Sequence, residues 1–538
     1  MIQKPINYND IKFYENYQLK LPLEMDILIP EDDSVRLLNL VLEGLDYSKL
    51  YNKYSVKGRK SKVDPKIMFK IITYANMENI YSSRDIEKAC RRDINFKWLL
   101  QGAQPPDHST ICRFEYEKID ENILEDLSCQ FINVLYTLGE ISFENIFIDG
   151  TKIEAAANRY TFVWRKTIIY HEKKMNIKIS EIFEKVNTIY NQNFTVNSKE
   201  DIYTIDEINN VLTFLQSIKN ETNTIFVYGK GRKKSELQKL TEGLEKYADR
   251  RIKYDDQYLK LGDRNSYSKT DVDATFMRMK EDHMKNGQLK PAYNLQIGVE
   301  SEYIIAAGIF NNPTDCPTLI PFLEKIKQNL GITYKNVIAD AGYESEENYM
   351  YLKENNQNSH IKPSNYKQSK KRSHKLKYGK VENMVYDKEN DSYICRNNRK
   401  LEYIGDRTVT SATGYETSRK IYKCSNCENC EFRKDCYTGK YSKEITISQN
   451  FSKLRKESLE NITSKEGILL RVNRSIQVEG AFGVIKNNYG FNRFLSKGIK
   501  NINIDILFLC LGYNVNKLHS RIMNNRLGLS LFKENEVA

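Results

Sequence analysis

The stretch that decides the fold lies near the end of the chain, at residues 474–494, and reads RSIQVEGAFGVIKNNYGFNRF. Read as a helix, it carries one apolar stripe made by Val478, Phe482, Ile485 and Tyr489. Glu479 and Lys486 lie on an adjoining face, two turns apart. Gly480 and Gly483 each cost about 1 kcal/mol against Ala inside a helix, which predicts a close approach to the backbone. The alternative is an amphipathic helix whose Glu–Lys pair is solvated.

Composition narrows the class of protein. The chain has 538 residues, enough for about two to four domains, and 83 Lys+Arg against 71 Asp+Glu, a net charge of +12. This basic balance favours a polyanionic partner such as nucleic acid. No secretory signal is visible at the N-terminus, and the longest apolar run, residues 506–511, is too short to span a bilayer. The ten cysteines are mostly scattered, which is typical of a reduced, cytoplasmic protein with no membrane partner.

Two further acids follow short apolar runs that read as buried strands. Residues 146–148 precede Asp149, and residues 337–339 precede Asp340. If these strands are neighbours, both carboxylates and Glu479 converge at one edge of the sheet. Such a cluster is repulsive unless cations fill it, and oxygen ligands favour Mg²⁺ or Mn²⁺. For Asp149 followed by Gly150, a plain turn is the alternative.

The N-terminal part, from Ser34 to about Lys118, has the pattern of short helices joined by tight polar turns. Arg84 and Arg91 lie on one of these helices. Arginines on such helices are compatible with helix-turn-helix-like DNA binding. A plain helical bundle is equally compatible with the pattern. His108, in the turn before a further helix, is expected to be a cap residue rather than a catalyst.

These motifs, taken in order, resemble those of DDE transposases of bacterial insertion sequences. The similar branch has an N-terminal helical domain and a cysteine-bearing insertion before the last acid. The matching pieces span roughly residues 30 to 515 and are specific as an ordered set rather than singly. They are Tyr54–Arg59 with Asp64-Pro65, Ser82–Cys90, Pro106–Thr110, Phe147–Ala155, Ala157–Lys166, Ile338–Ser345, and Val478–Lys486 with Gly490-Phe491.

The resemblance implies an α/β RNase H-like catalytic core with an N-terminal all-α domain, a helical insertion and a Cys-containing insertion. With the periodicities along the chain, we expect a lead-in (1–30), a helical DNA-binding domain (31–140) and a core in three parts (141–164, 290–365 and 465–515). We also expect a helical or coiled-coil insertion (165–265), a basic loop with the Cys cluster (366–460) and a C-terminal tail (516–538).

The resemblance also implies roles for individual residues. Asp149, Asp340 and Glu479 would be catalytic and would bind two Mg²⁺ or Mn²⁺ ions. Lys486 matches the lysine of the tyrosine-arginine-glutamate-lysine signature, which contacts DNA phosphate. Arg474 lies one position away from the arginine of that signature, and the tyrosine is missing, so Lys486 fits the role better.

The segment that follows the first aspartate contains three further candidates for DNA contact. Lys152 and Asn158 are expected to meet the DNA backbone. Trp164 has two interpretations: it stacks on a flipped base, as a tryptophan does in some relatives, or it packs in the interior. The hairpin-forming step of those relatives is not carried over to this chain.

Four cysteines are clustered late in the chain, at Cys424, Cys427, Cys430 and Cys436. They could bind a tetrahedral Zn²⁺, with Cys395 as a spare ligand. The spacing lacks two well-separated CxxC pairs, so unligated thiols are the alternative. An iron–sulfur cluster fits poorly, because five residues separate the third cysteine of the group from the last one, and no proline follows the last cysteine.

The sequence therefore predicts a transposase that binds the terminal inverted repeats of its element and catalyses Mg²⁺-dependent cleavage and strand transfer, a cut-and-paste reaction. The expected partners are the repeats and target DNA, with a homodimer in the end-paired complex. The expected location is the bacterial cytoplasm, at the nucleoid. Two alternatives stay open: an inactive transposase-derived DNA-binding protein, and an RNase H-like nuclease without strand transfer.

Overall fold

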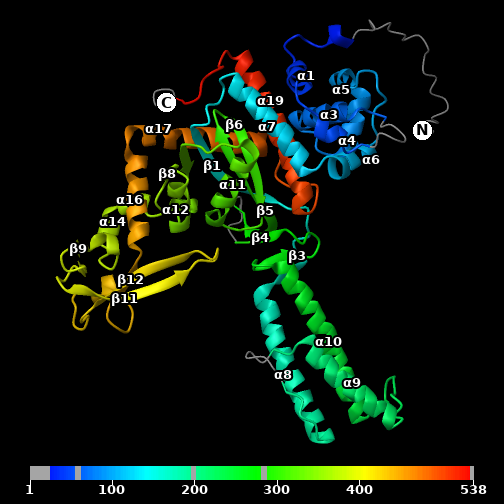
Figure 1. Ribbon diagram of the computed structural model, residues 1–538, viewed down its shortest axis with the longest axis vertical. Helices are drawn as coiled ribbons and strands as arrows, with labels where there is room; N and C mark the ends of the chain where they lie inside the picture. The colour runs from blue at the N-terminus through cyan, green and yellow to red at the C-terminus, as the bar shows by residue number, and fades with distance from the viewer. Residues whose placement is uncertain (1–24, 55–61, 196–201, 280–286, 533–538) are drawn as a thin grey trace, which may run out of the picture. The chain divides into compact units, whose positions relative to one another are not determined.

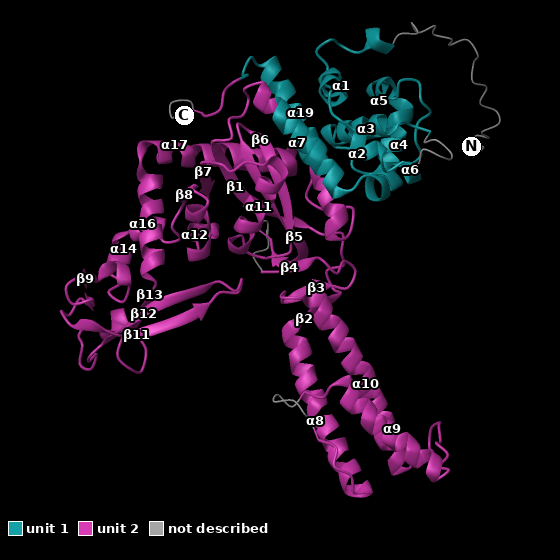
Figure 2. Ribbon diagram, in the orientation of Figure 1, with its two compact units in different colours: residues 1–134, 508–527 teal, residues 135–507, 528–538 magenta. Residues whose placement is uncertain are grey.

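The computed structural model describes residues 25–54, 62–195, 202–279 and 287–532 (Figure 1). They form two compact units, coloured separately in Figure 2: residues 1–134 with 508–527, and residues 135–507 with 528–538. Most of the expected lead-in and residues 55–59 of the Tyr54–Arg59 motif lie outside the described residues. Within the described part, no helix combines the length and the apolar character needed to cross a membrane.

The first unit is helical, as expected. Its elements are η2 (Met25–Leu28), α1 (Ser34–Glu43), α2 (Ser48–Tyr51), α3 (Pro65–Met77), α4 (Ser83–Arg92), α5 (Ile94–Leu99), α6 (His108–Arg113), η3 (Phe114–Lys118) and most of α7 (Glu121–Thr137). Aspartates start four of the helices by accepting backbone N–H bonds at the N-cap, as Asp64 does for α3. His108 is the first residue of α6, consistent with the expected structural role.

The first unit is completed by a segment from the end of the chain. Helix α19 spans Ile499–Met523, and its residues from Phe508 onward belong to this unit. The ring of Phe508 lies 5.5 Å from that of Phe69 in α3, and the Asn516 amide donates to the carbonyl of Met77 at 3.1 Å. Residue 516, where we expected a tail to begin, is inside this helix.

The second unit contains a mixed sheet of six strands. These are β1 (Asn145–Glu154), β4 (Thr275–Arg278), β5 (Leu289–Glu300), β6 (Tyr303–Phe310), β7 (Asn336–Ala339) and β8 (Asn358–Ile361). The order is β4-β5-β1-β7-β8, with β6 also paired to β5. β1 pairs antiparallel with β5 and parallel with β7, which pairs parallel with β8. The hairpin and buried strands expected from the sequence are confirmed.

One expectation about β1 was wrong. The strand does not end at Asp149 but continues to Glu154, because β5 pairs with it along its whole second half, from Asp149↔Ile297 to Glu154↔Ala292. What ends near Asp149 is the parallel pairing with β7, whose last partners are Phe147 and Ile338. Asp149 is therefore a mid-strand residue at the edge of the parallel half of the sheet.

Helices cover the core sheet. They are η4 (Cys316–Thr318), α11 (Leu319–Leu330), η5 (Ala341–Tyr343), α12 (Glu346–Glu354), α16 (Gln449–Thr463) and α17 (Lys465–Arg474). The 3-10 turn η4 directly precedes α11. Helix α17 packs on β1 and β7, while α11 packs against β6 (Figure 1).

After α17 the chain stays helical but widens twice. A π turn, η7 (Ser475–Glu479), is followed by α18 (Gly480–Gly483) and a second π turn, η8 (Val484–Asn488). The predicted apolar stripe is buried at all four positions, Val478, Phe482, Ile485 and Tyr489. Each π turn adds one residue to a turn, so the face-sharing of Glu479 and Lys486 assumed for a regular helix does not apply.

Two insertions complete the second unit. Strands β2 (Phe162–Trp164) and β3 (Ser266–Ser268) pair at the base of three helices, α8 (Arg165–Tyr190), α9 (Ile205–Glu221) and α10 (Glu236–Leu261), which share their own buried core. The Cys-containing insertion is an antiparallel sheet of β9 (Val385–Asp387), β10 (Ser392–Ile394), β11 (Lys400–Thr410), β12 (Glu416–Cys424) and β13 (Glu444–Ile447). The segment 367–380, expected to be a loop, contains α13 (Tyr366–Ser369) and α14 (Arg372–Lys375).

Candidate active site

The structure brings the first two acids to the same edge of the sheet. Strands β1 and β7 pair in parallel as Phe147↔Ile338, and two residues further along each strand lie Asp149 and Asp340. The Asp149 side chain is 13% exposed. Asp340 ends β7, where its Oδ1 accepts the N–H of Gly342 at 2.7 Å. The sequence analysis expected these carboxylates to converge if the two strands are neighbours, and the parallel pairing of β1 with β7 meets that condition. The role of the two acids stays a prediction.

The third acid comes from the helix that crosses this edge. Glu479 is the last residue of the π turn η7, which packs on β1 and β5. Its side chain is 64% exposed, so it reaches into solvent rather than into the core. Single π turns inside helices are found frequently at functional sites. The widened turn therefore marks the place where the helix presents its acid.

A cation links the helix to the strand. The Arg474 guanidinium lies with Nη1 3.2 Å from Asp149 Oδ2 and Nη2 3.8 Å from Glu479 Oε1. The Arg474 side chain is only 16% exposed. Since adjacent carboxylates repel each other in a site of low dielectric, a positive charge between them is stabilising. Arg474 supplies that charge in the protein alone, a contact that the sequence did not predict.

The three acids do not yet form a ready-made metal centre. Among the residues that the structure describes, no three His, Cys, Asp or Glu side chains are placed so that they could hold one ion. The donor chemistry nevertheless fits a hard cation, because all three groups are carboxylates.

A polar network that sequence reasoning missed lies next to this edge. Tyr343 donates its hydroxyl to Gln296 Oε1, and Gln296 Nε2 donates to Asp315 Oδ1 at 3.0 Å. Asn294 Nδ2 donates to the same oxygen at 2.7 Å. Burial, and then the charges of Asp315, Asp149 and Asp340, raises the pKa of Tyr343 well above its ordinary value. The signal in the sequence was Asp315, an acid between the apolar segment of β6 and helix α11.

Two of the predicted DNA contacts have partners within the protein. Lys152 Nζ donates to the carbonyl of Arg278 at 3.1 Å. The exposed Asn158 closes a turn, since its Oδ1 accepts the backbone N–H of Tyr160 at 2.8 Å and its own N–H donates to Thr270 Oγ1. Asn158 therefore has a local structural role, in addition to the DNA contact expected from the sequence.

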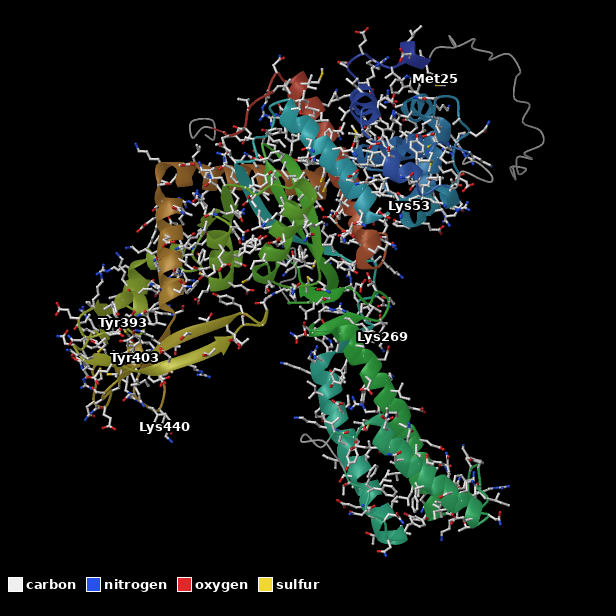
Figure 3. All side chains as sticks on the ribbon, viewed as in Figure 1. Met25, Lys53, Lys269, Tyr393, Tyr403 and Lys440 are labelled. Atoms are coloured by element: carbon white, nitrogen blue, oxygen red, sulfur yellow. The ribbon has the colours of Figure 1, made fainter. Side chains whose placement is uncertain are left out.

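Trp164 lines an open cavity of about 220 Å³ at the base of the three-helix insertion. Its ring also packs 5.8 Å from that of Phe276, so the residue is half-buried. The other walls include the aromatic rings of Phe162 and Tyr254 and the lysine Lys269, which Figure 3 labels just after β3. The geometry thus combines both interpretations of this residue: one side packs and the other side is open.

The remaining basic candidates are spread over both units. Lys486 belongs to the π turn η8 and is half-buried. Arg84 and Arg91 lie exposed on α4, and Arg91 forms an i,i+4 ion pair with Glu87 at 2.6 Å. The structure does not test the DNA contacts proposed for them.

The two glycines of the opening motif gave a prediction that is only partly right. A β-carbon on Gly480 or Gly483 would meet no heavy atom within 4 Å. The sheet therefore does not make the close approach to the helix backbone that the sequence predicted. Gly480 is exposed, so the remaining explanation is the approach of a molecule from outside.

The clustered cysteines surround one small cavity. Cys395, Cys424, Cys427, Cys430 and Cys436 line a space of about 30 Å³ in the Cys-containing insertion. Two of the sulfur atoms accept N–H bonds: Cys427 Sγ from the backbone of Lys443 at 3.2 Å, and Cys430 Sγ from the Asn397 amide at 3.5 Å. Figure 3 labels Tyr393 and Tyr403 in the adjoining sheet.

Without a metal, burial favours the protonated form of two of these thiols, Cys424 and Cys436. Burial, and then a hydrogen bond with Cys427, raises the pKa of Cys424 to about 11. Burial also raises the pKa of Cys436. As with the acids, the described sulfur atoms are not yet placed in a coordination arrangement.

Comparison with known families matches both ends of the chain. A family described as "Transposase DDE domain" matches residues 394–519, and one described as "Transposase domain (DUF772)" matches residues 23–117. The first match includes the cysteine cavity, Arg474, Glu479 and Lys486. The second includes helices α1 to α6. No curated protein and no solved structure matches.

Proposed function

From the premise that this chain is a DDE transposase of the kind typical of bacterial insertion sequences, we propose that it catalyses Mg²⁺-dependent cleavage and strand transfer at the ends of its own element. Transposases act on DNA, and the DDE domain implies an RNase H-like fold, with which the mixed sheet agrees. The observation that carries the proposal is the register of β1 and β7, which sets Asp149 beside Asp340 under the helix that bears Glu479.

DDE transposase domains generally use divalent metals, and we propose two Mg²⁺ or Mn²⁺ ions here. Asp149 and Asp340 would hold them from the sheet, and Glu479 would close the site from the helix. Such ions, when bound, activate a hydroxyl nucleophile and neutralise charge on the leaving oxygen of a phosphodiester. The carboxylates fit this role because oxygen donors of full negative charge are what these cations prefer.

The basic residues around the acids would position the DNA. We propose that Lys486 binds a phosphate next to the scissile bond and that Arg474, once released from Asp149, binds a second one. Lys152 and Asn158 would meet the backbone beyond the strand, and Trp164 a base at the open cavity. Exposed Arg84 and Arg91 of α4 would contact the terminal inverted repeats. Because two ends must be paired, the active form would be a homodimer.

A second proposal concerns the cysteine cavity, which we infer to bind a structural Zn²⁺ through Cys424, Cys427, Cys430 and Cys436. N–H bonds to sulfur stabilise thiolate, the form in which cysteine binds metal. The buried core of this insertion has only five residues, Leu401, Tyr422, Cys424, Ile445 and Ile447. Small modules with cores of this size commonly require a metal or disulfide for stability.

The decisive experiment uses the full chain, a DNA carrying the ends of the element, a target plasmid and Mg²⁺. Joined products are expected from the wild-type protein and from Asp263→Asn, an exposed acid outside the site. They should be lost in Asp149→Asn, Asp340→Asn and Glu479→Gln. Cleavage that survives all three substitutions would disprove the three-acid site.

The same assay separates the alternatives. Cleavage without joined products would favour an RNase H-like nuclease. Specific binding of the ends with neither cleavage nor joining, in Mg²⁺ and in Mn²⁺, would favour an inactive DNA-binding descendant of a transposase. End binding should weaken in Arg84→Ala while the Mn²⁺ affinity stays unchanged.

A further inference from the structure

We propose that Asp315 is a fourth carboxylate of the metal site, which helps to bind the ion on the Asp340 side. The inference rests on the proposed function and deepens it, because it adds a residue to the metal-binding set. Asp315 lies in the loop between β6 and η4, on a different element from each of the three acids.

The Asp315 side chain does not serve the helix that it precedes. It occupies the N-cap position of η4, yet its carboxylate makes no capping bond, and only its backbone carbonyl accepts the Thr318 N–H at 3.0 Å. An aspartate at this position ordinarily caps the helix with its side chain. Here the carboxylate turns to the sheet instead, so its position needs another explanation.

Two amides on β5 fix one carboxylate oxygen. Asn294 Nδ2 and Gln296 Nε2 both donate to Asp315 Oδ1, at 2.7 and 3.0 Å. The Gln296 amide is itself oriented, because its Oε1 accepts the hydroxyl of Tyr343. All three supporting residues are buried. Such a built support holds a carboxylate in one orientation, as partners of metal ligands do.

The other oxygen lies beside Asp340. A β-carbon placed on Gly342 would lie 2.9 Å from Asp340 Oδ1 and 3.4 Å from Asp315 Oδ2. The two carboxylates therefore border the same small space. Asp315 Oδ2 accepts no hydrogen bond from any described residue.

Gly150 opens the same space from the other strand. A β-carbon there would lie 2.7 Å from Asp315 Oδ1 and 2.2 Å from Gln296 Nε2. The residue next to Asp149 and the residue two positions after Asp340 thus both lack side chains where Asp315 approaches. The Asp315 carboxylate therefore lies close to the backbone of the glycine that follows each of the two strand acids.

The arrangement is unfavourable without a cation and favourable with one. Two carboxylates that share a site repel each other, and a divalent ion converts that repulsion into binding energy. Asp315 Oδ2 is the oxygen available for the ion, either directly or through one of its bound waters. The other oxygen, Oδ1, keeps its hydrogen bonds from the two amides, and these bonds fix the orientation of the carboxylate.

The test is Mn²⁺ binding by the full chain, measured by calorimetry alongside the cleavage assay. Asp315→Asn keeps the shape and removes the charge, and Asp315→Ser removes the charge without adding an N–H beside the two amide donors. Asp263→Asn, an exposed acid elsewhere in the same unit, is the matched control. Circular dichroism and thermal unfolding check that each variant folds.

We expect Mn²⁺ affinity to fall at least about tenfold in both Asp315 variants and to stay unchanged in the control. Cleavage should be lost at low Mn²⁺ and return at high Mn²⁺, which loss of fold would not allow. If the wild type binds Mn²⁺, Asp149→Asn abolishes this, and both Asp315 variants stay within twofold, the inference is overturned while the proposed function stands. If the wild type itself binds no Mn²⁺, the proposed function and this inference fail together.

Discussion

Arg474 Nη1 lies 3.2 Å from Asp149 Oδ2, so the first acid of the candidate site is paired with an arginine of the helical segment that carries the third acid. The same guanidinium reaches within 3.8 Å of Glu479. The guanidinium therefore occupies a position to which the two carboxylates would also attract a metal cation. If metal binds to these acids as proposed, Arg474 would compete with it for Asp149 and Glu479, the two carboxylates that the guanidinium approaches.

This competition predicts the behaviour of Arg474→Gln. Removing a unit charge about 4 Å from a carboxylate changes the interaction energy by on the order of 1 to 4 kcal/mol near a protein surface. Mn²⁺ should therefore bind at least about fivefold more tightly to the variant, as measured by calorimetry. Cleavage should nevertheless fall, because the proposed phosphate contact is lost. Arg159→Gln, which breaks an ion pair with Glu154, is the control. Unchanged or weaker Mn²⁺ binding in Arg474→Gln would show that the arginine does not compete.

Two glycines of the site predict opposite effects on stability. Gly150→Ala would place a β-carbon 2.2 Å from Gln296 Nε2, so the neighbouring side chains must shift. We expect a loss of about 1 to 3 kcal/mol in the free energy of unfolding and weaker Mn²⁺ binding. Gly480→Ala meets nothing within 4 Å and lies in a helix, so it should stabilise by about 0.5 to 1 kcal/mol.

Urea unfolding and calorimetry measure both glycine variants. Gly480→Ala should also lower cleavage without changing Mn²⁺ affinity, if DNA is what approaches this exposed stretch of helix. Full cleavage by a stabilised Gly480→Ala protein would leave the glycine without that function. Equal stability of Gly150→Ala and wild type would mean that Gln296 and Asp315 can move aside freely.

The cysteine cavity predicts one bound Zn²⁺ per chain, measured by atomic emission after purification without chelator. Because burial raises the pKa of the Cys424 thiol to about 11, binding must displace its proton. Zn²⁺ affinity should therefore rise with pH between about pH 6 and pH 8. Cys424→Ser should lose the metal and destabilise the insertion, and Cys112→Ser, in the other unit, should do neither. A chain that contains no Zn²⁺ and is unaffected by chelators would favour unligated thiols.

Trp164 provides its own optical probe. With Trp98→Phe as background, Trp164 is the only tryptophan, and its emission should change when DNA ends bind at the open cavity. Trp164→Ala should weaken end binding by about 1 to 3 kcal/mol, the range of base stacking on an aromatic ring. Trp164→Phe should restore part of that loss. If emission does not change and the alanine variant binds DNA normally, the residue only packs against Phe276.

Much of the fold was readable because buried strands and amphipathic helices leave clear local patterns. Residues 146–148 and 337–339 were recognisable as strands from apolar runs, and the Val478–Tyr489 stripe from its period. The end of β1 was misplaced because Asp149-Gly150 looks like a turn locally, whereas pairing with β5 continues through it. Such long-range pairing is not encoded in any single stretch.

The site was predictable in its acids but not in its supports. Asp149, Asp340 and Glu479 stood out through their place at the ends of elements and through the resemblance. The contact of Arg474 with Asp149 joins residues 325 positions apart in the sequence, so no local propensity reveals it. Asp315 lies in a loop, whereas Asn294 and Gln296 lie on β5, so their side chains meet only through tertiary packing.

Helix α19 has a consequence for the folding of the protein during its synthesis. The first unit needs residues 508–527 as well as residues 1–134, and synthesis proceeds from the N-terminus at about 5 to 20 residues per second. This unit therefore remains incomplete for roughly 20 seconds or more after its first helices emerge, until the intervening unit has been made. A message truncated before this helix would yield a polypeptide lacking part of its first folding unit, so prematurely terminated products should be short-lived rather than functional competitors.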